Sequence, residues 1–179
     1  MMNQVPLTSA SEASARSQDS ERKARDDGDS LYKVILVPID FSECSNRTLQ
    51  FATHIAIREN ANIWLLHVFR VPDYAVTQFG WGPEDCRSAE QEAQENLIAV
   101  EKEVLSRGIK VKACFRVGHP FEEIVSMAND PEVDLVLIGS HGCSAIKQLL
   151  LGSTVARVVE RARCPVLVVK ERFPIAYPA

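Results

Sequence analysis

The feature that most constrains the fold of this chain is an alternation of short apolar runs with segments of helical periodicity. The apolar runs cover residues 33–39, 62–69, 109–117, 133–138 and 165–170. Two of them, 33–39 and 133–138, are apolar almost throughout, as is typical of strands covered on both faces. Because a helical segment separates each strand from the next, we expect a parallel sheet with right-handed crossovers.

Helices are expected between the strands, at residues 43–59, 84–107, 120–129 and 153–163. Ser42 is placed to cap the first of these helices, and Pro120 is placed to begin the third. The predicted fold class is therefore α/β, a doubly wound, Rossmann-like parallel sheet of five strands with helices on both faces. The expected strand order is 3-2-1-4-5, although the residues alone do not fix it.

The two ends of the chain differ in composition from its middle. Residues 1–30 are rich in Ser, Ala, Asp, Arg and Glu and contain no aromatic residue. Such a segment buries too little apolar surface to offset the entropy of ordering, so we predict a disordered polar extension. Residues 31–170 form the expected folded domain, and 171–179 form a C-terminal tail. Residues 71–82 are expected to be an aromatic loop that could act as a lid or a partner surface.

Composition narrows the classes of function. The net charge of −4 and the pI near 5.6 argue against a nucleic-acid binder, which usually presents a basic face. No apolar stretch approaches the roughly 18 residues that span a bilayer, so no membrane insertion is expected. The N-terminus has no apolar segment of the secretory type.

The cysteines and histidines show no metal spacing. The cysteines are widely separated and form no C-x-x-C pair, at positions 44, 86, 114, 143 and 164. This pattern favours a reducing, cytoplasmic setting over a disulfide framework or a zinc site. Cys114 and Cys164 lie in or beside apolar runs and are expected to be small buried side chains. His67, near the end of an apolar strand, is expected to be a core histidine.

Two segments with distinctive chemistry follow the first and fourth strands. One is the run Pro38-Ile-Asp-Phe-Ser42, and the other is the glycine-containing stretch 139–155. In open α/β sheets, ligands bind beyond the carboxyl ends of the strands, at the point where the strand order reverses. With the expected order, these two segments face each other across that crevice.

The second segment has the composition of an anion site. Gly139 and Gly142 lack a Cβ atom, so their backbone can take a positive φ and approach a ligand closely. Gly152, Ser153 and Thr154 begin the last helix, where unpaired N–H groups and the helix dipole favour an anion. Hydroxyl groups at this point can also donate hydrogen bonds to phosphate oxygens.

Asp40 would repel phosphate, but its carboxylate can accept from an adenine amino group or a ribose hydroxyl. The two segments therefore fit a nucleotide, with the base and ribose over the first strand and the phosphates over the fourth. The residues alone leave an ordinary surface loop equally open, since Ser153 can simply cap the last helix. Neither a Walker A lysine nor the dinucleotide fingerprint is present.

Four stretches of the sequence, taken together, resemble one protein family. They are Lys33-Val-Ile-Leu-Val-Pro-Ile-Asp-Phe-Ser42, Asp134-Leu-Val-Leu-Ile-Gly-Ser-His-Gly142, Leu151-Gly-Ser-Thr-Val155 and Cys164-Pro-Val-Leu-Val-Val-Lys170. With these stretches, residues 31–170 resemble a universal stress protein domain. The ATP-binding branch of that family is marked by G-x2-G-x9-G-[S/T]. This spacing is matched without a gap by Gly139, Gly142, Gly152 and Ser153.

The resemblance implies an adenine nucleotide, ATP first of all, and a set of binding residues. Those implied around the adenine and ribose are Pro38, Ile39 and Asp40, with Val68 lining the adenine pocket. Those implied around the phosphates and ribose are Gly139, His141, Gly142, Gly152, Ser153 and Thr154. Mg²⁺ held mainly by the phosphates is expected with the nucleotide, because this ion needs few protein ligands.

The chain departs from the family pattern at one position. Some members have a second hydroxyl residue two places after the serine that ends the motif. This chain has Val155 at that position and Thr154 just before it. A phosphate or metal contact from position 155 is therefore not carried over to this chain.

Three functions remain open on the sequence. The first is an ATP-binding stress-response regulator in which nucleotide occupancy controls conformation, oligomerisation or partner binding. Dedicated catalysis is not expected, because no nucleophile–base pair is evident near the glycines. The second is a slow ATPase or nucleotide-processing enzyme that uses His141 or Asp40 as its base. The third is an interaction module with an empty pocket.

The last strand predicts self-association. Residues 165–170 should lie at an edge of the sheet, where unpaired backbone groups and apolar side chains favour pairing with another strand. A homodimer formed edge to edge would cover that strand, and the family resemblance implies the same arrangement. A further protein partner is possible, and the sequence does not identify it.

Overall fold

The structure is a computed structural model that describes residues 30–71, 73–142 and 151–170. The predictions made for the polar extension and for the C-terminal tail fall on residues 1–29 and 171–179, which lie outside the described residues. Cys143 also lies outside them. Both strands that end at the predicted site, and the helices that follow them, lie within the described ranges.

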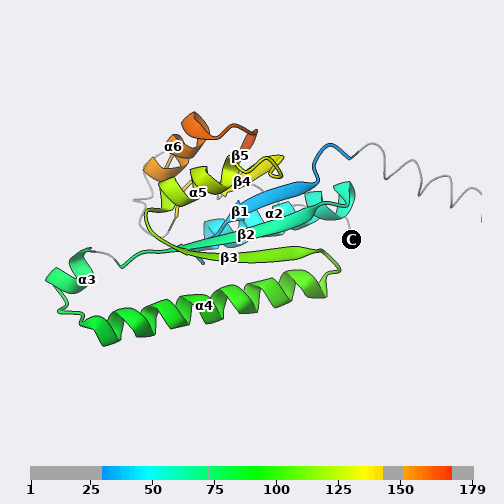
Figure 1. Cartoon of the computed structure of the whole chain (residues 1–179). Helices are drawn as coiled ribbons and strands as arrows, with labels where there is room; N and C mark the ends of the chain where they lie inside the picture. The colour runs from blue at the N-terminus through cyan, green and yellow to red at the C-terminus, as the bar shows by residue number, and fades with distance from the viewer. Residues whose placement is uncertain (1–29, 72, 143–150, 171–179) are drawn as a thin grey trace, which may run out of the picture. The chain divides into compact units, whose positions relative to one another are not determined.

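Five parallel strands form one sheet in the order β3-β2-β1-β4-β5 (Figure 1). Their bounds are β1 (Val34–Pro38), β2 (Asn62–Phe69), β3 (Val111–Val117), β4 (Leu135–Gly139) and β5 (Val166–Val169). In the centre of the sheet, Ile35 lies beside Ile63 on one side and Leu135 on the other. The predicted fold class and strand order are confirmed.

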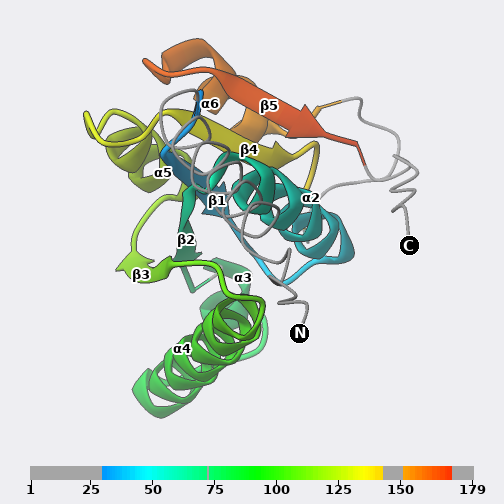
Figure 2. The same cartoon turned by 90° about the vertical axis from the view of Figure 1, so that its right-hand side faces the viewer.

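Helices cover both faces of the sheet (Figure 2). The described helices are α2 (Glu43–Glu59), α3 (Asp73–Thr77), α4 (Pro83–Ser106), α5 (Pro120–Ala128) and α6 (Ser153–Arg161). Residues of α2 and α4 pack against one face, and residues of α5 and α6 pack against the other. Helix α2 has the bounds that the sequence predicts, and its N-cap is Ser42, whose hydroxyl accepts from the Ser45 N–H at 3.2 Å.

Two expectations about the helices are wrong. The stretch 71–82 is not wholly a loop, because α3 lies within it. Ala75 of this short helix is buried, and its carbonyl accepts from the Trp81 N–H at 3.0 Å. Tertiary packing thus stabilises a helix that is too short to show a period in the sequence. Helix α6 ends two residues earlier than expected, because Ala162 is already extended ahead of Pro165.

The core forms on the two faces of β1. Ile35 and Val37 pack into the cluster beneath α2 and α4, whereas Val34 and Leu36 pack into the cluster beneath α5 and α6. Successive side chains of a strand point to opposite faces, so a strand covered on both sides must be apolar at every position. All five residues of β1 and all five of β4 are buried for this reason.

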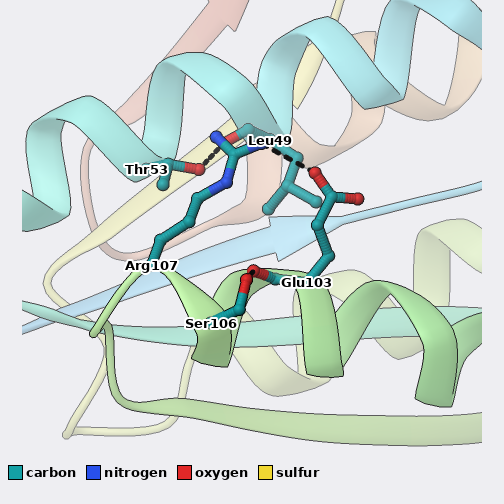
Figure 3. Close-up of polar contacts among 5 residues, drawn as sticks. All are labelled: Leu49, Thr53, Glu103, Ser106 and Arg107. Carbon is teal, nitrogen blue, oxygen red and sulfur yellow. Dashed lines mark hydrogen bonds and ion pairs between the residues drawn. The ribbon is translucent and has the colours of Figure 1, made fainter.

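Polar contacts close the last turn of α4, which covers the same face of the sheet as α2 (Figure 3). The Arg107 Nη2 group donates to the Glu103 Oε1 atom at 2.7 Å, and the Ser106 hydroxyl donates to the Glu103 carbonyl at 2.7 Å. On α2, the Thr53 hydroxyl donates to the Leu49 carbonyl at 2.6 Å. Figure 3 draws this turn of α2 and the last turn of α4, which lie on the face of the sheet that both helices cover.

A single carboxylate joins the beginnings of β1 and β4. The Asp134 Oδ2 atom accepts from the Lys33 N–H at 2.7 Å and from the Val34 N–H at 2.9 Å. The Asp134 N–H donates in turn to the Val34 carbonyl at 3.0 Å. Hydrogen bonds to an ionised acceptor are stronger than neutral ones, so this contact fixes the register of the two central strands.

Replacing this carboxylate should destabilise the fold. We expect Asp134→Ala to lower the free energy of unfolding by about 1–3 kcal/mol, because two backbone N–H groups lose a charged acceptor. Urea unfolding followed by circular dichroism measures the change. Glu132→Ala, at an exposed position two residues away, is the matched control and should change stability by less than about 0.5 kcal/mol. Equal stability of the two variants would contradict this role.

Candidate functional site

A cavity of about 460 Å³ opens at the carboxyl ends of β1 and β4. We call it the main cavity. It lies where the strand order reverses, since β2 follows β1 on one side and β4 pairs with β1 on the other. This is the position where open α/β sheets bind their ligands. Its volume falls in the range of about 300–1,000 Å³ that is usual for small-molecule sites.

All of the residues that the sequence predicts for a nucleotide site lie on the wall of the main cavity. They are Pro38, Ile39, Asp40, Val68, Gly139, His141, Gly142, Gly152, Ser153 and Thr154. The structure thus brings together residues that are more than one hundred positions apart in the sequence. Their role in binding stays a prediction.

The sequence did not indicate the remaining wall residues, which are Ser45, Leu66, Pro120, Ile124, Ile138 and Val155. Alternation could have found Leu66, since it lies two residues before Val68 and so shares its face of β2. Helical spacing relates Pro120 to Ile124 in the same way. Nothing in the sequence places α5 beside this cavity, however, so its two residues required the structure.

The loops after β1 and β4 touch at Asp40 and Gly142. A Cβ atom added to Gly142 would overlap the Asp40 Oδ2 atom. The Oδ1 atom of the same carboxylate accepts from the Ser42 hydroxyl at 2.6 Å and from the Ser42 N–H at 3.1 Å. The Asp40 carboxylate is therefore held against the glycine loop, and only glycine leaves room for it there.

Neither Gly139 nor Gly142 uses the positive φ that glycine permits. What requires glycine at position 139 is the close approach of α2. A Cβ atom at Gly139 would lie 2.8 Å from the Cys44 Sγ atom and 3.2 Å from the Thr48 Oγ1 atom. Both distances are shorter than ordinary contacts, so this glycine serves the packing of α2 on β4.

The N-terminus of α6 faces the main cavity with unused hydroxyl groups. Gly152 is the N-cap, and the Ser153 side chain does not cap the helix as the alternative interpretation required. The hydroxyls of Ser153 and Thr154 make no hydrogen bond within the described part of the chain. The Gly152 N–H, in contrast, donates to the Ser140 carbonyl at 2.8 Å. Hydroxyls and N–H groups at a helix start are suited to hold an anion.

His141 lies on the wall of the main cavity with a neighbour that orients it. Its Nδ1 atom lies 2.9 Å from the hydroxyl of Ser140, which is buried. The cavity wall within the described residues includes no lysine and no arginine. His141 and the start of α6 are therefore the groups best placed to meet negative charge there.

The thiols of the described residues are not arranged for chemistry. Cys44, Cys86, Cys114 and Cys164 are free, and no described residues form a group of three or more metal-ligating side chains. Burial raises the pKa of the Cys114 and Cys164 thiols above the ordinary value, which lowers their reactivity at neutral pH. Both pack against the core but are only partly buried, so the expectation of buried side chains is met only in part.

Comparison with known proteins identifies the family. A model of the universal stress protein family matches residues 31–170. The chain belongs to the universal stress protein family. The resemblance found in the sequence is therefore confirmed at the level of the family, while membership of its ATP-binding branch stays a prediction. Among the described residues, none of the helices has the length and apolar composition that crossing a membrane requires.

Relatives in the universal stress protein family cover most of the chain. The universal stress protein MJ0531 of Methanocaldococcus jannaschii is 34% identical over 145 residues, which make up 80% of this chain and 85% of the relative. The solved structure of MJ0577 superposes with a TM-score of 0.65 and 35% identity, covering 78% of this chain and 96% of the other. A universal stress protein solved in complex with cAMP has a TM-score of 0.58 and 26% identity, covering 78% and 98% of the two chains.

The packing of α2 on Gly139 can be tested with a double-mutant cycle. We expect Gly139→Ala to lower the free energy of unfolding by about 1–3 kcal/mol, because its methyl group would press on the Cys44 thiol. In the Cys44→Ala background the same change should cost clearly less, since the sulfur atom is gone. Urea unfolding of the four proteins measures the coupling. Additive effects of the two substitutions would contradict the contact.

Proposed function

We propose that this universal stress protein binds an adenine nucleotide, ATP first of all, in the main cavity and acts as a regulator. The observation that carries the proposal is that an apolar part and a polar part of the main cavity's wall adjoin each other. An apolar cleft at the strand-order reversal continues directly onto the start of α6. A nucleotide has the same division, with a flat base at one end and anionic phosphates at the other.

The apolar part of the wall fits an adenine ring. Its side chains come from β2, β4, α5 and the loop after β1, and they include Ile39, Leu66, Val68, Ile138 and Ile124. A purine base needs such surfaces above and below its plane, and a few polar groups fix its orientation. Asp40, held by Ser42 at the edge of this region, is suited to accept from a ribose hydroxyl.

The polar part of the wall fits phosphate groups. Ser153 and Thr154 offer hydroxyls that have no hydrogen-bond partner among the described residues, and the helix dipole adds a favourable potential for an anion. Thr154 takes the place of the hydroxyl that other members have at position 155, where Val155 is buried in the core. Because no lysine or arginine lies on the described wall, Mg²⁺ bound to the phosphates would offset their charge.

A relative supports the choice of ligand. The universal stress protein solved with cAMP, at 26% identity, carries an adenine nucleotide. We therefore extend to this chain the class of ligand, an adenine nucleotide. The hydroxyls at the start of α6 add to the polar wall formed by Gly142 and His141, which favours a ligand with more than one phosphate.

A regulatory role fits the site better than a catalytic one. Asp40 is the single carboxylate on the described wall of the main cavity, so no carboxylate pair lies there for acid–base chemistry. A ligand that binds between the loops after β1 and β4 favours the loop arrangement that binds it most tightly. A protein partner could bind preferentially to that loop arrangement. The reducing, cytoplasmic setting predicted from the cysteine pattern belongs to this proposal.

Binding of ATP can be measured by isothermal titration calorimetry with the full chain and Mg²⁺. We expect the double variant Ser153→Ala, Thr154→Ala to weaken ATP binding roughly tenfold, because hydrogen bonds to charged phosphate are lost. Adenosine should bind both proteins alike, since it has no phosphate. Ser88→Ala, at an exposed position on α4, is the control. Absence of ATP binding by the unaltered chain, and of nucleotide released on denaturation, would overturn the proposal.

The alternative of a slow ATPase has a separate readout. If His141 or Asp40 acts as a base, then ATP turnover should occur at ordinary enzymatic rates and disappear in either His141→Ala or Asp40→Asn, while ATP binding survives. Under the regulatory proposal, turnover is negligible in all of these proteins. An interaction module with an empty pocket would show no ATP binding by the unaltered chain, whatever Gly142→Val does to stability through its overlap with Asp40.

We also propose that the chain forms a homodimer through β5. Among the described residues this strand pairs with β4 alone, which leaves its other backbone edge open there, and Leu167 is 40% exposed. We expect Leu167→Glu to convert a dimer into a monomer, measured by analytical ultracentrifugation at micromolar concentration. Leu105→Glu, on an exposed leucine of α4, should leave the dimer intact. An unaltered chain that sediments as a monomer would contradict the proposal.

A further inference from the structure

A second cavity of about 260 Å³ lies on the opposite face of the sheet from the main cavity, between the end of β2 and α4. We call it the α4 cavity. Its wall consists of Phe41, His67, Val68, Phe69, Arg70, Ala89, Glu92, Ala93 and Asn96. Val68 is the one residue that lines both cavities among those described. The function proposed above makes no use of this space.

Aromatic rings form the inner part of the α4 cavity. The Phe41 ring stacks on the His67 ring, with centroids 4.5 Å apart and planes inclined by 27°. Phe115 supports this group from behind, with its centroid 5.7 Å from that of His67 and 6.1 Å from that of Phe69. Rings held against one another in this way present a fixed, largely apolar surface, which suits a flat aromatic ligand.

His67 adds a directed hydrogen-bond acceptor. Its Nδ1 atom lies 2.8 Å from the Ile39 carbonyl oxygen, which can only accept, so Nδ1 carries the proton. No hydrogen bond to Nε2 is formed within the described residues. Every fully buried side-chain nitrogen and oxygen among the described residues has a hydrogen-bond partner. Because Nε2 has no such partner, it is not fully buried. It keeps access to the open space beside it, which is the α4 cavity.

The charge state of His67 supports the acceptor role. His67 is buried, with 8% of the residue exposed. This burial lowers the pKa of His67 below the ordinary value of 6.5, against the opposing effects of the Ile39 carbonyl and of Asp40. The ring is therefore neutral at physiological pH. A neutral imidazole with its proton on Nδ1 offers a lone pair at Nε2.

The opposite wall of the α4 cavity is made of small residues. Ala89 and Ala93, one helical turn apart on α4, leave room above the rings. Glu92 and Asn96 lie at the exposed rim. The volume is just below the usual range of ligand pockets, so the space suits one or two fused rings and is too small for a nucleotide.

We propose that the α4 cavity binds a free, small planar aromatic molecule that carries an N–H or O–H donor, which donates to the Nε2 atom of His67. Ring stacking against Phe41 and Phe69 supplies the apolar contact, and the donor supplies selectivity. A buried acceptor that gains a partner discriminates between ligands that differ only in that donor. The site is independent of whether the main cavity binds a nucleotide.

Indole and benzofuran test the donor, because they have nearly the same shape and only indole has an N–H group. Each is titrated into the full chain labelled with ¹⁵N, and amide shifts are followed by NMR. We expect indole to bind with a Kd on the order of 1 mM and to shift residues 89–96 together with His67. Benzofuran should bind about tenfold more weakly.

Two alanines of α4 give a matched pair of variants. Ala89→Leu fills the α4 cavity and should abolish the indole shifts, whereas Ala99→Leu, at an exposed position on the same helix, should leave them unchanged. Both substitutions replace one good helix former by another, so the fold should survive in each case. The dispersion of the NMR spectrum checks this directly.

Three outcomes would overturn the proposal. The first is no saturable shift of residues 89–96 with indole, or shifts confined to the wall of the main cavity at residues 139–142 and 152–155. The second is equal affinity for indole and benzofuran, which would remove the role of His67. The third is clearly tighter binding of N-acetyl-tryptophanamide than of indole, which would assign the cavity to a side chain of a peptide instead of a free small molecule.

Discussion

Burial of β1 and β4 on both faces of the sheet is the constraint on which the rest of this structure depends. Each strand has five buried residues, and the two pair in parallel. Parallel pairing brings their carboxyl ends to the same edge, so the loops that follow must meet there. The contact of Gly142 with Asp40 is the direct result, and the main cavity opens beside it.

Two glycines of the motif are required for different physical reasons. Gly139 leaves space for the packing of Cys44 and Thr48 from α2, and Gly142 leaves space for the carboxylate of Asp40. A Cβ atom at Gly152 would make only ordinary contacts. The glycine spacing that marks a nucleotide site in this family is therefore also required by packing. The loops after β1 and β4, together with α2, pack closely around that site.

Besides Val68, one short segment of chain borders both cavities. Ile39 and Asp40 line the main cavity, whereas Phe41 points to the α4 cavity on the other face. Phe41 takes a left-handed backbone conformation with φ 62°, which is uncommon for a phenylalanine. Its ring stacks on His67, and His67 donates to the Ile39 carbonyl. The reversal at Phe41 thus lets three successive residues serve opposite faces of the sheet.

The sequence by itself determined the sheet class, the bounds of α2 and β2, and the cap at Ser42, because apolar periodicity and helix capping act between residues that are near in the chain. It also indicated ten wall residues of the main cavity, through a family motif. Only the tertiary structure decided why position 139 must be glycine, that α5 contributes to the wall, and that a second cavity lies beneath α4. Those features join side chains from elements far apart in sequence, and no local pattern encodes how such elements pack.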